Sequence, residues 1–286
     1  MKQDYQIQRL DFSNTDDMNK LVLLQNIVYV GKHKFESQTF QHWYLDNPNG
    51  HVVSFNALYE DTIVAHYALI PVKMEIEGHV ISGLLSMATV THPAHRGKGL
   101  FVKLAKLTYD YAKQDGFKFV IGVANANSFP GFIKHLSFQH IGQLDVMIGC
   151  SKNIIENGVK IFKMHWDKDS IQWRFNDNRY SKGSSSVFGT KAFWKFKKAP
   201  LVNTYMGYVQ KKLLDELSIP NVKSIWRPFN LYVGIGSNAR EIGYHDIPKF
   251  IKRSPFHLIF LDLTEGKLPQ MTKDNVFFQL MDFDVA

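Results

Sequence analysis

The stretch Val90–Phe101, VTHPAHRGKGLF, decides the predicted fold. A β-rich run ends in a proline, two glycines follow, and an amphipathic helix is predicted directly afterwards. Amide groups at a helix N-terminus are unpaired and lie at the positive end of the helix dipole. Gly97 and Gly99 let an anion approach the backbone, while Arg96 and Lys98 add positive charge. This stretch therefore predicts a strand–loop–helix turn that binds a pyrophosphate.

Regular secondary structure is predicted on both sides of this turn. The expected helices are Met18–Val30, Leu100–Gln114 and Phe129–Leu136. The expected strands are Val52–Tyr59, Thr62–Ile70, Val72–Ile76, Leu84–Thr91, Phe117–Ala124 and Ile141–Ile148, with Pro71 separating the second from the third. Strands come first as an antiparallel meander and then alternate with helices. This order predicts a mixed α/β fold of the layered α+β type, in which helices pack on a sheet.

The length of 286 residues leaves room for two domains. Residues Ser151–Asp169 look like a connection. Beyond it, the Trp-Arg-Phe sequence at Trp173–Phe175 echoes the Trp-Tyr-Leu sequence at Trp43–Leu45, each just ahead of an asparagine. We expect a first domain over residues 1–150 and a second α/β unit, similar to the first or degenerate, over residues 151–286.

The composition is that of a globular protein, with 45% hydrophobic and 21% charged residues. A single cysteine, Cys150, excludes an internal disulfide framework and a multi-cysteine zinc site, so we expect no metal and a reducing compartment. We find no signal peptide and no apolar run of the roughly 18 residues that a membrane span requires. A cytoplasmic location is the expectation.

The positive charge is unevenly placed along the chain. Residues 1–150 hold 13 basic and 13 acidic residues, whereas residues 151–286 hold 21 basic and 13 acidic, so the second part carries the whole net charge of +8. Such a surface would attract an acidic or phosphate-bearing partner. Arg174, Arg179 and Arg227 are the candidates for bidentate contacts with it.

The turn that begins at Arg96 resembles the acyl-coenzyme-A loop of the GNAT superfamily of N-acetyltransferases, which reads Arg/Gln-x-x-Gly-x-Gly/Ala. Arg96, Gly97, Lys98 and Gly99 fit this pattern, whereas Phe101 replaces its last small residue. The resemblance covers roughly residues 5–150 and implies a GNAT-like mixed sheet with acetyl-CoA as cofactor. It also implies that two parallel strands, at Ala88–Thr91 and Phe119–Val123, splay to admit the pantetheine arm. The cofactor-binding residues it implies are Thr89, Val90, Thr91, Arg96, Gly97, Lys98, Gly99, Leu100, Phe101, Asn125 and Asn127.

The resemblance continues over Asn125–Phe138 with two departures. Ser137 replaces the glycine that the family has before the last strand, and the family's tyrosine, which protonates the leaving thiolate, is missing. Counting forward from Asn125 places Phe132 at the tyrosine position, and counting back from Ser137 places Ile133 there. Neither side chain carries a hydroxyl group.

An amine acceptor must lose a proton before its nitrogen attacks a thioester, so the reaction needs a base. His92, at the end of the predicted cofactor strand, and His66, in the meander, are the candidates. Glu75 and Glu77 alternate along one strand and are interpreted as a solvated face. Cys150 has no identifiable base beside it, so a thiol nucleophile is not expected.

Three functions are compatible with these residues. The leading prediction is an acyl-CoA-dependent N-acetyltransferase that moves an acetyl group to a primary amine of a small molecule, such as a nucleotide-linked amino sugar. A tandem GNAT-type transferase that uses aminoacyl-tRNA is the enzymatic alternative, and a non-catalytic CoA-binding module is the other. Apart from tRNA in that alternative, no nucleic-acid partner is expected. The aromatic and basic stretch Lys191–Lys198 could stack on a nucleic acid, but we interpret it as an edge strand, and Gly183–Ser186 as a flexible loop.

Overall fold

The structure, a computed structural model, describes residues 4–30, 34–151, 153–176, 184–187, 190–196, 201–210, 228–247 and 255–283. The chain divides into two compact units. Unit 1 comprises Met1–Val72, Ser82–His140 and Ile259–Pro269, and unit 2 comprises Lys73–Ile81, Ile141–Leu258 and Gln270–Ala286. The stretch 141–150, expected in the first domain, thus lies in unit 2.

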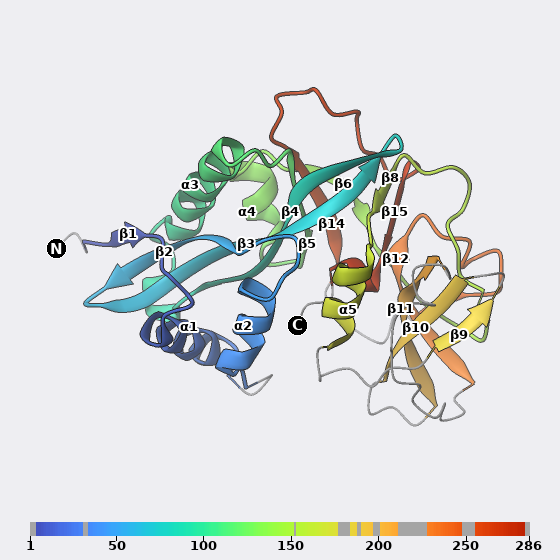
Figure 1. Cartoon of the computed structure of the whole chain (residues 1–286), viewed down its shortest axis with the longest axis horizontal. Helices are drawn as coiled ribbons and strands as arrows, with labels where there is room; N and C mark the ends of the chain where they lie inside the picture. Colours follow the sequence, from blue (N-terminus) through green and yellow to red (C-terminus); the bar gives the residue numbers. More distant parts are fainter. Residues whose placement is uncertain are drawn as a thin grey trace. The chain divides into compact units, whose positions relative to one another are not determined.

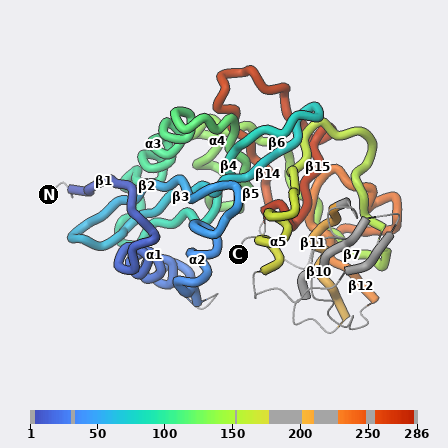
Figure 2. Tube along the Cα trace, in the orientation of Figure 1, coloured from blue at the N-terminus to red at the C-terminus, as the bar shows by residue number. Residues whose placement is uncertain are grey.

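The sheet of unit 1 is mixed. Its strands are β1 (Gln6–Gln8), β2 (Val53–Tyr59), β5 (Phe119–Ala124) and the unit 1 parts of β3 (Thr62–Ile76), β4 (His79–Thr91), β6 (Gln139–Gln143) and β14 (His257–Asp262). β1 pairs with β2 and β2 with β3 in antiparallel fashion, whereas β4 and β5 pair in parallel. β14 follows β5 in the strand order, and Figure 2 shows its red trace next to β5. The predicted layered α/β class is confirmed.

Two pairs of helices cover the two faces of this sheet (Figure 1). They are α1 (Thr15–Val28) with α2 (Ser37–Tyr44), and α3 (Leu100–Gln114) with α4 (Phe129–His135). Successive strand residues point to opposite faces. Accordingly, His66 of β3 contacts Tyr44 of α2, whereas the adjacent Tyr67 contacts Tyr109 of α3. The three helices expected in this half are thus confirmed, and each packs an apolar face on the sheet.

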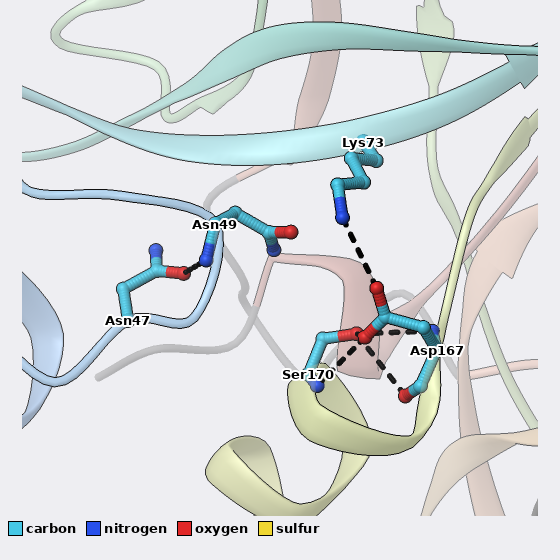
Figure 3. A network of polar contacts seen from close by, with 5 residues as sticks. All are labelled: Asn47, Asn49, Lys73, Asp167 and Ser170. Carbon is cyan, nitrogen blue, oxygen red and sulfur yellow. Dashed lines mark hydrogen bonds and ion pairs between the residues drawn. The ribbon is translucent and has the colours of Figure 1, made fainter.

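The strand β3 runs without interruption through Pro71, so the prediction of two strands separated at this residue is wrong. A proline in a strand removes one ladder donor. Here the pairing of β3 with β2 ends at Leu69, opposite Val53, so the missing N–H interrupts no pair in that ladder. The carbonyl oxygen of Pro71 accepts a hydrogen bond from Asn47 Nδ2 at 3.0 Å. Asn47 Oδ1 in turn accepts from the amide of Asn49, as Figure 3 shows.

The strand β4 begins at His79, five residues before the predicted start at Leu84, because β3 and β4 form a tight hairpin. Glu77 has φ 50° and Gly78 has φ 80°, the pair of positive values found in type I′ turns. Glu77 therefore lies in the turn and not on a strand face, which corrects the prediction. Glu75 is in β3, with its carboxylate 3.9 Å from Lys163 Nζ.

Unit 2 is built mainly of strands. Besides the remaining parts of β3, β4, β6 and β14 it contains β7 (Asp145–Gly149), β8 (Phe162–Met164), α5 (Lys168–Asn176), β9 (Ser184–Val187), β10 (Thr190–Phe196), β11 (Val202–Gln210), β12 (Phe229–Ile235), β13 (His245–Asp246) and β15 (Val276–Gln279). β12 pairs with β11 in parallel and with β7 and β15 in antiparallel fashion. A short 3-10 helix, Leu280–Asp282, ends the described chain.

Four sequence interpretations in this region are wrong. The expected strand Ile141–Ile148 is two strands, β6 and β7, interrupted at Leu144, whose amide donates to the carbonyl oxygen of Phe256. Ser184–Ser186, expected in a flexible loop, belongs to β9 and is ordered by pairing with β10. β10 pairs with β9 on one side and β11 on the other, so Thr190–Phe193 is not at an edge. Ser151–Asp169 is more than a connection, because it contains β8 and the start of α5.

Helix α5 of unit 2 starts with a polar cap (Figure 3). Asp167 Oδ1 accepts hydrogen bonds from the amide and the hydroxyl of Ser170, and Asp167 Oδ2 lies 3.1 Å from Lys73 Nζ. Burial raises the pKa of Asp167, but the hydrogen bonds from Ser170 and Lys73 outweigh it and hold the pKa below its usual value. The cap fixes the start of α5 on the β3 strand of the same unit.

Candidate functional site

The loop before α3 has the backbone geometry of an anion cradle. Gly97 and Gly99 have φ values of 71° and 73°, in the left-handed region that favours glycine. A Cβ atom at either position would have no protein atom within 4 Å, so the space beside the loop is open. Within the described ranges, the amides of Gly97, Lys98 and Gly99 have no hydrogen-bond partner. The first amides of α3 add further unpaired donors.

Cationic side chains flank this cradle. Arg96 Nε donates to the carbonyl oxygen of Thr91 at 3.3 Å, which holds the exposed guanidinium beside the end of β4. Lys98 is exposed. A pocket of about 170 Å³ lies here and is lined by Thr91, His95, Arg96, Gly97, Lys98, Gly99, Leu100 and Phe101. The Leu100 side chain is buried and only its backbone can serve a ligand.

β4 and β5 diverge next to the loop. Their parallel pairing extends over Leu84–Ser86 and Val120–Gly122 only. Beyond it, Ala88 has φ 49°, a left-handed conformation that is strained for a residue with a Cβ atom. The residues that follow, from Thr89 onward, have no partner in the β5 ladder. Val90 among them is buried through its side chain. The parallel pairing thus ends before the stretch Ala88–Thr91, at which the resemblance implies that the two strands splay.

The glycine-rich loop, the helix that follows it and the strand that carries Ala88 lie within a stretch that a comparison with protein families matches. Residues 10–138 match the model described as the acetyltransferase (GNAT) domain. This stretch is therefore similar to GNAT acetyltransferase domains.

Solved structures extend the similarity along the chain. A probable N-acyltransferase from Enterococcus faecalis V583 superposes with a TM-score of 0.64 at 7% identity, covering 91% of this chain and 73% of that chain. A GCN5-related N-acetyltransferase from Anabaena variabilis ATCC 29413 gives 0.62 at 9% identity, covering 92% and 74%. One from Kribbella flavida gives 0.59 at 9% identity, covering 90% and 70%. These likenesses establish a shared fold. No relative was found among curated protein sequences.

The histidine predicted as a base, His92, lies at the start of a 3-10 turn (Pro93–His95). Its Nδ1 accepts a hydrogen bond from the amide of Ala94 at 3.2 Å, so His92 takes a proton at Nδ1 only after this bond breaks. Its ring packs edge-on against His95. His95 Nδ1 is 3.0 Å from the Tyr5 hydroxyl, and burial, followed by the charges of His92 and Lys98, lowers the pKa of His95.

The other histidine considered, His66, is buried between the sheet and α2. Its Nδ1 donates to Asn56 Oδ1 at 2.6 Å, because an amide oxygen can only accept, and its Nε2 accepts from the Tyr44 hydroxyl at 2.8 Å. Burial lowers the pKa of His66 to about 3. Both ring nitrogens are engaged and the side chain is 1% exposed, so it presents no lone pair to an acceptor.

Phe132, at the position of the family's tyrosine, is a core residue. It is 5% exposed and its ring meets the rings of Phe101 and Phe138 edge-on at centroid distances of 5.2 and 5.1 Å. Phe101, which replaces the last small residue of the loop pattern, therefore packs under the loop as part of this aromatic cluster. The alternative position, Ile133, also packs against this core.

Asn125 and Asn127 follow β5 on the exposed surface. Asn125 Oδ1 accepts hydrogen bonds from the amides of Asn127 and Ser128 at 2.9 and 3.1 Å. The carboxamide oxygen of Asn125 therefore orders the turn that precedes α4. Neither asparagine lines the pocket of the glycine loop.

The basic residues predicted in the second half have different positions. Arg174 is 4% exposed, with its guanidinium over the rings of Trp166 and Trp173, which leaves little surface for a bound acceptor. Arg179 and Arg227 lie outside the described residues, as do Lys197, Lys198 and Gly183. Cys150 is exposed, and the described ranges contain no cluster of residues suited to a metal ion and no helix able to cross a bilayer.

Two residues near the site escaped the sequence interpretation. His95 could have been found from its spacing, because it lies three residues after His92 in a turn and this spacing places the two rings on one side. Gln25, whose Nε2 donates to the carbonyl oxygen of Ala88 at 2.9 Å, has no local signal, because it lies in a helix far away in sequence.

Proposed function

We propose that this protein is an acetyl-CoA-dependent N-acetyltransferase that acts on a primary amine of a small molecule. Residues 1–150 hold the cofactor and residues 151–286 shape the acceptor site. The observation that carries the proposal is the open, partnerless cradle at Gly97–Gly99 beside the strained Ala88 of β4. The residues present fit a pyrophosphate, since they offer backbone donors, a helix N-terminus and two cations.

Each part of the site has a role in this proposal. The loop amides of Gly97, Lys98 and Gly99 bind the pyrophosphate, and main-chain groups near Thr89 and Thr91 hold the pantetheine arm. An amide near Ala88 faces the thioester carbonyl. Acetyl-CoA would supply the acetyl group: the acceptor nitrogen would bond to the carbonyl carbon as the carbon–sulfur bond breaks, the nitrogen would lose its proton to a base, and CoA would leave as a thiolate that water protonates.

The proton of the amine goes to His92 in this proposal. His92 is partly exposed at the end of β4, in contrast with the buried His66. His92→Gln should lower kcat by about 10²-fold, within the range for a general base, with a weaker effect on acetyl-CoA affinity. The parallel variant His95→Gln is the control, and a larger loss there would reassign the base.

Binding of coenzyme A tests the cofactor assignment directly. Coenzyme A at 100 times its Kd should stabilise the wild type by about 2.7 kcal/mol, which a thermal melt detects. Gly99→Val should abolish this shift, because the side chain enters the cradle. Gly116→Val is a matched control, since Gly116 also has a positive φ, 89°, and open space around it but ends α3. Equal coenzyme A affinity in the two folded variants would refute the loop assignment.

Turnover on a panel of amines tests the reaction and the acceptor. We expect acetylation of an acidic or phosphate-bearing amine such as a nucleotide-linked amino sugar, because the net charge of +8 lies in residues 151–286. The Michaelis constant of the acceptor should then rise with ionic strength. Coenzyme A binding without acetylation of any amine would favour the non-catalytic module. Salt-sensitive binding of aminoacyl-tRNA would favour the tRNA-dependent transferase.

A further inference from the structure

Gln25 is an unusual residue for a helix interior face. It lies in α1, is 0% exposed, and reaches from the helix to β4, where Nε2 donates to the carbonyl oxygen of Ala88 at 2.9 Å. Its other polar atom, Oε1, is buried and has no hydrogen-bond partner among the described residues. The neighbouring buried residues of α1, Met18, Leu21 and Leu24, are all apolar.

The buried amide of Gln25 gives the folded protein no net stability. A buried acceptor without a partner costs about 1–3 kcal/mol, which matches or exceeds the net contribution of about 0.5–1.5 kcal/mol from one hydrogen bond. A methionine of similar shape would pack against the same surface without this cost. The amide therefore provides something that an apolar side chain cannot, namely a fixed donor to one carbonyl oxygen of β4.

That carbonyl belongs to the strained residue of the site. A left-handed conformation costs a residue with a Cβ about 1–2 kcal/mol, and it persists only where the surroundings fix it. Ala88, with φ 49°, is the positive-φ residue of β4 within the described chain. Ala88 lies two residues beyond Ser86, which forms the last pair of the β4–β5 ladder with Gly122.

We propose that Gln25 is a positioning residue for acetyl transfer: by donating to the Ala88 carbonyl oxygen it holds this strained residue of β4 in the one orientation that presents the β4 amides to the thioester carbonyl. The proposal rests on the proposed function. As the amine nitrogen attacks, negative charge develops on the thioester oxygen, and a donor displaced by about 1 Å stabilises it less. Gln25 itself contacts neither substrate.

Three variants test this role. Gln25→Met removes the donor together with the partnerless acceptor, and Gln25→Glu replaces the amide by a carboxylate that donates to Ala88 only when protonated. Gln41→Met, at an exposed position of α2, is the control. The measurements are urea unfolding, coenzyme A affinity by calorimetry, and steady-state kinetics from pH 6 to 9 with hydroxylamine or the best amine of the panel.

For Gln25→Met we expect unchanged stability and coenzyme A affinity within about twofold, and a kcat lower by about 10- to 100-fold. For Gln25→Glu we expect the ratio of its kcat to that of the wild type to rise at least about tenfold as the pH falls from 9 to 6, because burial raises the pKa of a carboxyl and the protonated form restores the donor. Gln41→Met should match the wild type.

The outcomes separate two failures. A wild type that binds coenzyme A but acetylates no amine overturns the proposed function, and the role of Gln25 falls with it. An active wild type with a Gln25→Met variant of equal kcat overturns the positioning role alone. Loss of stability and coenzyme A affinity in step with kcat would make Gln25 a structural residue, which also overturns the proposal.

Discussion

Lowering the pH should destabilise the protein through one buried side chain, His66. The folded protein holds it neutral, with a pKa of about 3 against about 6.5 in an unfolded chain. Its contribution is fully present above pH 6.5 and is lost as the pH falls towards 3. At pH 4.5, two pH units below the unfolded pKa, protonation of His66 stabilises the unfolded chain by about 2.7 kcal/mol. The folded chain, in which His66 stays neutral, gains no such stabilisation. Such a loss is a large part of a typical stability of about 5–15 kcal/mol.

The assay compares the wild type with His66→Gln by urea unfolding at pH 8, 6 and 4.5. The glutamine offers a donor to Asn56 and an acceptor to Tyr44 but does not titrate, and the difference between the two proteins cancels the contribution of other groups. Between pH 8 and pH 4.5, the unfolding free energy of the variant should rise by about 2.7 kcal/mol relative to that of the wild type. A control, His135→Gln at an exposed position, should show no such gain. A difference constant to within about 0.5 kcal/mol across this range would refute the reasoning.

Other residues give independent predictions. Burial raises the pKa of Asp282 to about 7. The folded protein therefore favours the protonated carboxyl, and its contribution to the unfolding free energy is fully present below pH 4 and is lost as the pH rises through 7. Asp282→Asn should remove about 2.7 kcal/mol of this dependence between pH 5 and pH 8.5, measured by urea unfolding at these two values. Phe132→Ala should lower the unfolding free energy by about 3–5 kcal/mol, whereas Phe132→Tyr should alter turnover more than coenzyme A affinity, checked by kinetics and calorimetry. Gly83→Ala should cost about 1–3 kcal/mol in a thermal melt, because its Cβ would overlap the ring of Phe119.

The loop and helix of the site could be predicted because their signals are local. Gly97 and Gly99 are needed for positive φ values, and α3 carries a continuous apolar face. The sheet was predictable where β-rich runs stand between turn residues, as in β2 and β5. These features depend on residues within a few positions of one another, so the sequence pattern contains the information.

The rest depends on contacts between distant residues. A proline is a poor strand residue by itself, and only the end of the β2 ladder at Leu69 explains why β3 continues through Pro71. His66 looks like any other histidine until Tyr44 and Asn56 enclose it. The pairing of β9 with β10 outweighs the loop preference of three serines. Tertiary hydrogen bonds decide these cases, and no spacing along the chain reports them.

Unit 1 is assembled from three separate stretches, and the last of them has a consequence for synthesis on the ribosome. Phe260 of β14 stacks on Phe119 of β5 at 5.6 Å, and the amide of Leu263 donates to Lys118. These partners emerge more than a hundred residues after His140, which takes on the order of 10 s at typical translation rates. During that interval the β5 edge and the face of the Phe119 ring that Phe260 later covers stay exposed, which gives an opportunity for chaperone binding or aggregation. A chain stopped after residue 150 keeps the family motif but leaves this edge permanently open.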